Sequence, residues 1–244
     1  RGVASQHRVK VVGSGHSFTA IACTEGLMVG MGGFTGITHV DRPRHRVTVG
    51  AGTVLADLNQ RLHELGMALP NLGDIDRQTI AGATATATHG TGSGFQCISA
   101  AIVGARIVTG DGSVLEVSET ERPDLLNAVR VGLGALGILT SITLQCVPAF
   151  NLHAVESTHS IDEILDDIDG LTAANDHVEF YGFPNTDVGQ LIVNTRTESP
   201  VARRGRIGAF VNDELIANGA FGLLNRVGRR FPGAVAPTIA RIIR

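Results

Sequence analysis

The sequence predicts an α+β chain of two domains that meet near residue 150. Three glycine-rich turns, each beside an apolar run of strand length, characterise the part before this point. The part after it follows the order strand, helix, strand, strand, which is typical of a separate α+β unit. We therefore expect one domain over residues 1–150 and the beginning of a second domain over residues 151–244.

In the first domain, short apolar runs alternate with turn residues. The expected strands are residues 9–13, 27–31, 46–50, 101–109, 113–118 and 138–147. Thr53 is predicted to cap a helix that ends at Gly66. The apolar face of this helix carries four leucines, Leu55, Leu58, Leu62 and Leu65. A Gly-Asp-Gly turn at residues 110–112 predicts a hairpin, and a second helix is expected over residues 123–131.

In the second domain, Ser160 and Glu163 have the spacing of a capping box and predict a helix that runs to about Leu171. Strands are expected over residues 177–183 and 190–197. Residues 201–244 are basic with helical periodicity. They form either a surface helix pair that covers a sheet or an arginine-rich amphipathic segment that contacts an anionic membrane.

Composition excludes several classes of protein. The net charge of −3 and the scattered arginines of the main body argue against a nucleic-acid surface. The 31 glycines show no period, which excludes collagen and low-complexity chains. Three distant cysteines indicate a reducing compartment, so we expect a cytoplasmic protein, with peripheral membrane contact through residues 201–244 as the alternative. No signal peptide and no apolar run of about 18 residues is present.

The first glycine-rich turn, Gly13 to Ser17, follows an apolar strand in the stretch VVGSGHSF. Successive backbone N–H groups in such a turn form a nest that binds anions. A P-loop nucleotide hydrolase is excluded because no lysine follows the turn, and a dinucleotide-binding Rossmann turn would need a third glycine. The turn carries His16 instead.

The second and third glycine-rich segments suit a long ligand with a flat ring. Residues 79–94 are rich in threonine, alanine and glycine and offer hydroxyls along a polar path, although a half-exposed threonine-rich strand is the plainer interpretation. Residues 132–137 would let a ring lie against the backbone. Three such turns suit an extended cofactor with a central diphosphate. A flavin dinucleotide would also explain His16, because a neutral imidazole can attack the 8α-methyl carbon of the isoalloxazine.

Four segments carry a resemblance to a known family: VKVVGSGHSFTAIACTEG, VTVGAGTVLADLNQRLHELGMALPNLGDID, TIAGATATATHGTG and GALGILTSITLQCVP. In this order they resemble the FAD-binding domain of aldonolactone oxidoreductases, the L-gulono-1,4-lactone oxidases and dehydrogenases with D-arabinono-1,4-lactone oxidase. These belong to the vanillyl-alcohol-oxidase superfamily. The resemblance implies a PCMH-type FAD-binding domain of two small α+β subdomains, followed by part of an α+β substrate domain.

The resemblance also implies site residues. Gly13, Ser14, Gly15 and Ser17 would hold the FAD diphosphate, and His16 would take the position of the covalent 8α-histidyl linkage, which some relatives lack. Thr79 would lie beside the flavin near the substrate. The backbone of Ile138 would meet the adenine, and His89 would either contact the cofactor or brace its turn. The other implied cofactor contacts are Thr84, Thr88, Thr91, Gly92, Ser93 and Gly94. The other histidines show no metal-ligand spacing, so no metal site is expected, and Asp166, Asp167 and Asp169 are expected to form a solvated helix face.

The expected activity is oxidation of a CH–OH group of a sugar lactone by hydride transfer to flavin N5, with O₂ or another electron acceptor. The alternatives are an alditol oxidase acting on xylitol or sorbitol, and a truncated flavin-binding protein without catalysis. Relatives end in a segment resembling His-Trp-Gly-Lys, whereas the only lysine here is Lys10 and tryptophan is absent. We therefore expect a fragment that lacks the N-terminal part of the FAD domain and the C-terminal catalytic residues, and that is inactive by itself.

Overall fold

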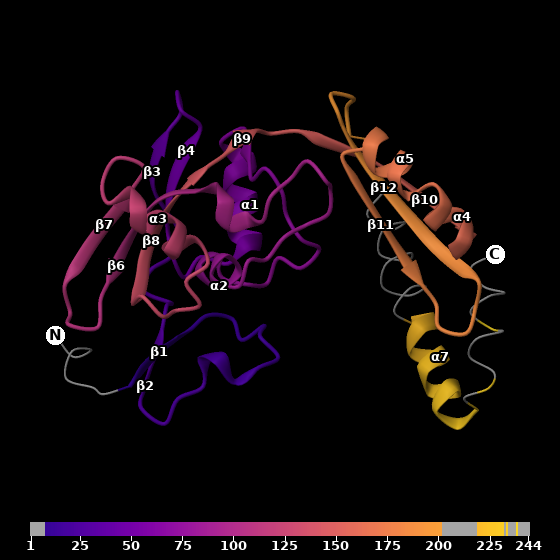
Figure 1. Ribbon diagram of the computed structural model, residues 1–244, viewed down its shortest axis with the longest axis horizontal. Coiled ribbons are helices and arrows are strands. Elements are labelled where there is room, and N and C mark those ends of the chain that lie inside the picture. The colour runs from indigo at the N-terminus through magenta and orange to yellow at the C-terminus, as the bar shows by residue number, and fades with distance from the viewer. Residues whose placement is uncertain (1–7, 202–218, 232, 234–237, 239–244) are drawn as a thin grey trace. The chain divides into compact units, whose positions relative to one another are not determined.

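The computed structural model describes residues 8–201, 219–231, 233 and 238. The chain divides into two compact units (Figure 1). The first consists of residues 1–91 and 95–149, and the second consists of residues 92–94 and 150–244. Each unit has its own sheet and its own covering helices, so the two are described separately.

The first unit contains a five-stranded antiparallel sheet with the order β3-β4-β8-β6-β7 (Figure 1). Its strands are β3 (Ile37–Asp41), β4 (Arg46–Gly50), β6 (Ile102–Val108), β7 (Val114–Ser118) and β8 (Ile138–Gln145). The hairpin expected at residues 110–112 is confirmed, because β6 and β7 pair on either side of it. The edge strand β3 was not expected, since its sequence ITHVD has no continuous apolar run.

Two smaller pairs of strands belong to the same unit. β1 (Val9–Val12) and β2 (Leu27–Gly30) pair in parallel, with a short 3₁₀ turn, η1 (Ala20–Ala22), between them. β5 (Met67–Ala68) pairs with β9 (Val147–Pro148). The parallel β1–β2 pair matters for the site, because the glycine-rich turn at residues 13–17 leaves the end of β1.

Three helices pack in this unit: α1 (Leu55–Glu64), α2 (Ile80–Ala85) and α3 (Pro123–Arg130). α1 buries Leu55, Leu58 and Leu62, as the leucine spacing predicted. They join the apolar residues of β4, β6 and β8 in one core, and each hydrophobic side chain removed from water contributes about 1.5–3 kcal/mol. A second 3₁₀ turn, η2 (Ile98–Ala101), leads into β6.

The predicted cap of α1 is wrong. Val54 occupies the N-cap position without a side-chain hydrogen bond. The hydroxyl of Thr53 donates instead to the Gly50 carbonyl at 2.7 Å and accepts from the Gly36 N–H at 2.9 Å. Thr53 therefore ties the start of α1 to the β3–β4 region, a long-range role that competes with local capping. Gly66 does end the helix, in a left-handed conformation (φ +73°).

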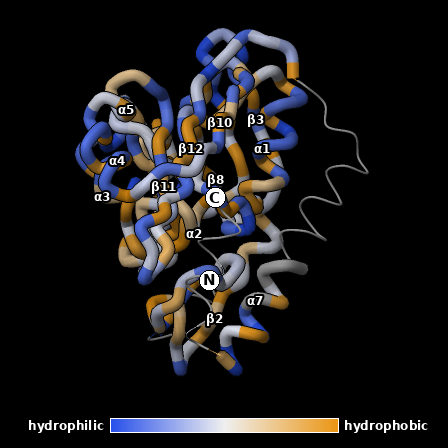
Figure 2. Tube along the Cα trace, turned by 90° about the vertical axis from the view of Figure 1, so that its right-hand side faces the viewer, coloured by the Kyte–Doolittle hydropathy of each residue, from blue (hydrophilic) through white to orange (hydrophobic). Residues whose placement is uncertain are grey.

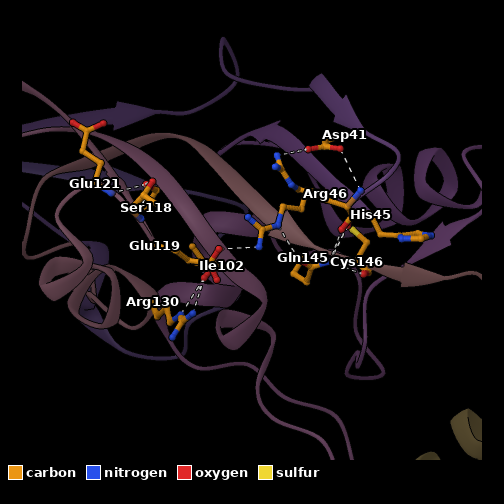
Figure 3. Close-up of polar contacts among 12 residues, drawn as sticks. Asp41, His45, Arg46, Ile102, Ser118, Glu119, Glu121, Arg130, Gln145 and Cys146 are labelled. Atoms are coloured by element: carbon orange, nitrogen blue, oxygen red, sulfur yellow. Dashed lines mark hydrogen bonds and ion pairs between the residues drawn. The ribbon is translucent and has the colours of Figure 1, made fainter.

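Polar side chains join distant parts of this unit (Figure 3). Arg46 on β4 donates from Nε to Gln145 Oε1 at 2.9 Å and pairs through Nη2 with Glu119 at 2.8 Å. Arg130 of α3 donates twice to the carbonyl of Ile102, at 3.1 and 2.9 Å. These bonds tie the sheet to the loop after β7 and to the helix that covers β6.

The second unit contains an antiparallel sheet in the order β10-β12-β11, whose strands are β10 (Asn151–Ser160), β12 (Val188–Thr197) and β11 (His177–Gly182). The capping box of Ser160 and Glu163 is confirmed at the start of α4 (Ile161–Asp166). The single helix predicted to Leu171 is wrong. It breaks at Asp167 (φ −109°, ψ 10°), and a second helix, α5 (Ile168–Ala174), follows.

The described part of the basic C-terminal segment includes the helix α7 (Gly219–Arg230), which carries both hydrophobic and hydrophilic residues (Figure 2). The rest of the predicted segment, residues 202–218, 232, 234–237 and 239–244, lies outside the described residues. Among the helices that the structure describes, none has the length and apolarity to cross a bilayer.

Candidate functional site

A cavity of about 310 Å³ opens in the first unit, a size within the range of small-molecule sites. Three stretches contribute to its wall: β1 with the turn that follows it, the segment around the start of α2, and the loop before β8. Its lining residues include Lys10 through Ser17, Thr19, Ile21 to Cys23, Met28, Met31, Gln78, Thr79, Ala81, Gly82, Ala85, Thr86, Leu133, Gly134, Gly137 and Leu139. The three glycine-rich segments of the sequence thus meet at one place.

The turn Gly13–Ser17 forms one edge of the cavity and is exposed throughout. Gly15 has a left-handed backbone (φ +74°), which glycine adopts at little cost. The space beside Gly13 is occupied by the hydroxyl of Thr79, so a Cβ there would collide with it. The backbone of Gly13 consequently lies close to Thr79 at the start of α2.

Thr79 has two roles in this wall. It is buried and is the N-cap of α2, where its hydroxyl accepts a hydrogen bond from the Gly82 N–H at 3.2 Å. The α2 residues that line the cavity, Ala81, Gly82 and Ala85, lie on one face of the helix. Their small side chains leave room for a ligand, which is the reason that a helix of alanine and glycine serves at this position.

The loop at residues 132–137 forms the third part of the wall. Gly137 (φ +138°) begins the approach to β8, and a Cβ at this residue would collide with the carbonyl of Val108. Leu133 lines the cavity, is 50% exposed, and donates its N–H to the Ala85 carbonyl at 3.3 Å. The loop is therefore attached to the end of α2.

Two polar side chains in the wall have unused bonding capacity. The side-chain oxygen of Gln78 is buried and has no hydrogen-bond partner among the described residues. Leaving such an acceptor unpaired costs about 1–3 kcal/mol. Lys10 is in none of the ion pairs found in the described part of the chain. The wall thus offers an acceptor, a cation and the N–H groups of a glycine turn.

These groups fit FAD. The turn and Lys10 suit a diphosphate, since backbone N–H nests and ammonium groups both bind phosphate oxygens. The unpaired oxygen of Gln78 suits an N–H or O–H donor of the cofactor. The apolar lining, Ile21, Met28, Met31, Leu133 and Leu139, suits the faces of planar rings.

The structure places the predicted site residues in two groups. Those that line the cavity are Gly13, Ser14, Gly15, His16, Ser17 and Thr79. Thr84 is fully buried and donates its hydroxyl to the Ile80 carbonyl at 2.8 Å, and Ile138 is 8% exposed between two lining residues. Neither side chain is part of the lining.

The remaining predicted residues lie on the turn after α2, outside the lining of the cavity. His89 Nδ1 lies 3.0 Å from the carbonyl of the adjacent Gly90, a contact that braces the turn. Asn71 Nδ2 donates to the Thr91 carbonyl at 3.3 Å, and the Thr88 N–H donates to the Ala83 carbonyl at 2.9 Å. Gly92, Ser93 and Gly94 group with the second unit.

Sequence reasoning did not single out Gln78, Leu133 or Lys10 as site residues. Lys10 could have been recognised from the sequence, because it is the only lysine of the chain and lies three residues before Gly13. Gln78 and Leu133 gave no signal that a single sequence could reveal. Their significance comes from an unpaired buried atom and from a backbone angle, and neither is visible in residue types.

Two family models match the chain. The model described as an FAD binding domain matches residues 3–118, and the model described as D-arabinono-1,4-lactone oxidase matches residues 142–244. The fold also matches the crystal structure of cholesterol oxidase from B. sterolicum, with a TM-score of 0.75 and 19% identity over 97% of this chain and 50% of that chain. At this identity the match shows the fold alone.

Curated relatives are lactone enzymes. The chain is 45% identical to L-gulono-1,4-lactone dehydrogenase of Mycobacterium tuberculosis over 97% of this chain and 54% of the relative. It is 38% identical to L-gulonolactone oxidase of Bos taurus, over 79% of this chain and 44% of the relative. The chain spans about half the length of the curated relatives it matches. Together, the two family models and these relatives show that the chain has an FAD-binding domain in its first part and is similar to the aldonolactone oxidases and dehydrogenases over the rest of its length.

Proposed function

We propose that this chain is part of an oxidoreductase that oxidises a CH–OH group of a sugar lactone such as L-gulono-1,4-lactone. The observation that carries the proposal is the cavity of the first unit, where the glycine turn, Gln78 and Leu133 together fit FAD. The names of the relatives supply the substrate class. When bound, FAD accepts a hydride at N5 from the carbon that carries the hydroxyl group.

Different residues of the cavity bind different parts of FAD. The N–H groups of Gly13–Ser17 and the ammonium of Lys10 bind the diphosphate. Gln78 accepts a hydrogen bond from the cofactor, which removes the cost of its unpaired oxygen. Thr79, the N-cap of α2, would lie beside the flavin ring near the substrate, and His16 would lie at the dimethylbenzene edge, where its imidazole would form the covalent bond.

Anaerobic reduction tests this function directly. The complete protein that contains this chain is loaded with FAD and mixed with L-gulono-1,4-lactone in the absence of O₂, and the absorbance of the oxidised flavin is followed. Bleaching supports the proposal. Bleaching with xylitol but not with the lactone would support an alditol oxidase instead, an alternative that no named relative favours.

Two further experiments separate the roles of the cofactor and of the acceptor. If FAD binds but stays oxidised with every lactone, the chain is a flavin-binding unit without catalysis of its own. If bleaching occurs, admission of O₂ shows whether oxygen or another acceptor reoxidises the flavin. A yellow colour that fails to follow the protein through gel filtration would refute FAD binding itself.

A further inference from the structure

The loop before β8 contains a leucine in a backbone conformation that leucine disfavours. Gly132 to Ala135 form a turn that is closed by the Ala135 N–H donating to the Gly132 carbonyl at 2.8 Å. Both central residues have positive φ, +50° at Leu133 and +70° at Gly134. This is the pattern of a type I′ turn, whose first central position favours asparagine, aspartate or glycine.

The side chain of Leu133 does not compensate for this conformation by burial in the core. It is 50% exposed, although a leucine normally gains its stability by leaving water. Leu133 does line the cavity, and its N–H is fixed by the Ala85 carbonyl of α2. The turn thus holds a half-exposed apolar residue at the wall of the site.

Residues held in disfavoured backbone conformations concentrate at ligand sites, where the ligand makes use of them. We propose that Leu133 is a cofactor-positioning residue whose side chain packs against a planar ring of FAD. The proposal rests on the FAD site described above and adds to it a contact through a side chain, where the glycines act through backbone. In the bound state the leucine is covered by the ring, and this coverage offsets the cost of the turn.

Leu136 provides a matched control. It belongs to the same loop and is 41% exposed, but it is not part of the cavity lining. General loss of apolar surface from the loop would affect Leu133 and Leu136 variants alike, whereas contact with the cofactor would affect Leu133 variants alone.

The test uses the chain in a His16→Ala background, so that FAD exchanges freely, with Leu133→Gly, Leu133→Asn, Leu133→Met and Leu136→Ala added singly. Flavin fluorescence gives the FAD dissociation constant, and circular dichroism gives the melting temperature without FAD. Glycine and asparagine adopt a positive φ at lower cost than leucine does, so both substitutions should raise the melting temperature by about 2–4 °C. Both should weaken FAD binding by roughly tenfold, because the apolar contact is lost.

The Leu133→Met variant distinguishes the effect of the apolar side chain from the effect of the backbone conformation. Methionine keeps the apolar contact, so FAD affinity should stay within about twofold of the parent, as it should for Leu136→Ala. The proposal is overturned if Leu133→Gly and Leu133→Asn also bind FAD within about twofold, or if Leu133→Met loses as much affinity as Leu133→Asn. A parent that binds no FAD would instead overturn the FAD site itself.

Competition with ADP identifies the ring. If the Leu133 variants weaken ADP and FAD in parallel, the leucine packs on the adenine. If they weaken FAD alone, it packs on the isoalloxazine. Both results support a ring contact.

Discussion

The hydroxyl of Thr79 fills the space next to Gly13 that any side chain at this position would need. The same hydroxyl accepts the Gly82 N–H and begins α2. One threonine therefore caps a helix and keeps the glycine-rich turn close to that helix. The contact joins residues that lie 66 positions apart in the sequence. It makes glycine at position 13 a requirement of packing, in addition to any need of the cofactor.

This contact predicts a non-additive pair of substitutions. Gly13→Ala should lower the free energy of unfolding by about 1–3 kcal/mol, because the added methyl group collides with Thr79. Thr79→Ala should cost about 1 kcal/mol through loss of the cap. Because Thr79→Ala also removes the colliding oxygen, the double variant should lose less than the sum. Urea unfolding followed by circular dichroism measures all three, and strictly additive losses would contradict the contact.

Substitution of Gln78 should have opposite effects on the stability of the protein and on its affinity for FAD. Gln78→Met removes an unpaired buried oxygen, so the protein without FAD should gain about 1 kcal/mol, whereas FAD affinity should fall by roughly tenfold. Gln145 is the matched control, because its amide accepts from Arg46 at 2.9 Å and donates to the Arg44 carbonyl at 2.8 Å. Gln145→Met should lower stability without changing FAD affinity. A loss of stability in Gln78→Met would show that the oxygen is paired.

The proposed covalent linkage of FAD to His16 predicts whether the flavin stays with the protein or is released when the protein is denatured. When the FAD-loaded chain is precipitated with acid, the yellow colour should stay with the protein, and in His16→Ala it should pass to the supernatant. His89→Ala is the control, because His89 contacts its own turn and lies outside the cavity lining. Its flavin should stay with the pellet. Release of all flavin from the unaltered protein would refute the covalent bond.

Substitution of Arg46 should destabilise the protein more than substitution of the neighbouring Arg44. Its two bonds, to Gln145 and Glu119, join β4 to β8 and to the loop after β7, and the side chain is 31% exposed. Arg46→Ala should cost about 1–2 kcal/mol. Arg44 is 74% exposed and pairs with Asp41 at 3.3 Å, so Arg44→Ala should change stability by less than about 0.5 kcal/mol. Equal losses in urea unfolding would contradict this ranking.

Cys146 predicts a loss of stability at alkaline pH. Burial raises the pKa of this thiol from 9.0 to about 11. Above pH 9 the unfolded chain releases this proton while the folded chain keeps it, so the contribution is present below pH 9 and is lost between about pH 9 and pH 11. The loss should be roughly 2 kcal/mol. In Cys146→Ala the unfolding free energy should fall less over this range, and identical pH profiles would rule out the effect.

Residue types predicted much of the fold where a local pattern coincides with the final packing. The leucines of α1, the Gly-Asp-Gly hairpin and the capping box of α4 are local features, and all three are present. The prediction failed where a distant partner decides the outcome. Thr53 bonds Gly50 and Gly36 in place of capping α1, and the edge strand β3 is recognisable only through its pairing with β4.

The sequence by itself predicted the cofactor through four segments that resemble a known FAD-binding domain, because such a resemblance depends only on residue type and order. Tertiary structure alone decided which residues complete the wall. Gln78 and Leu133 acquire their significance from an unpaired oxygen and a positive φ angle. These properties arise when segments distant in sequence pack together, and no local pattern of residues encodes them.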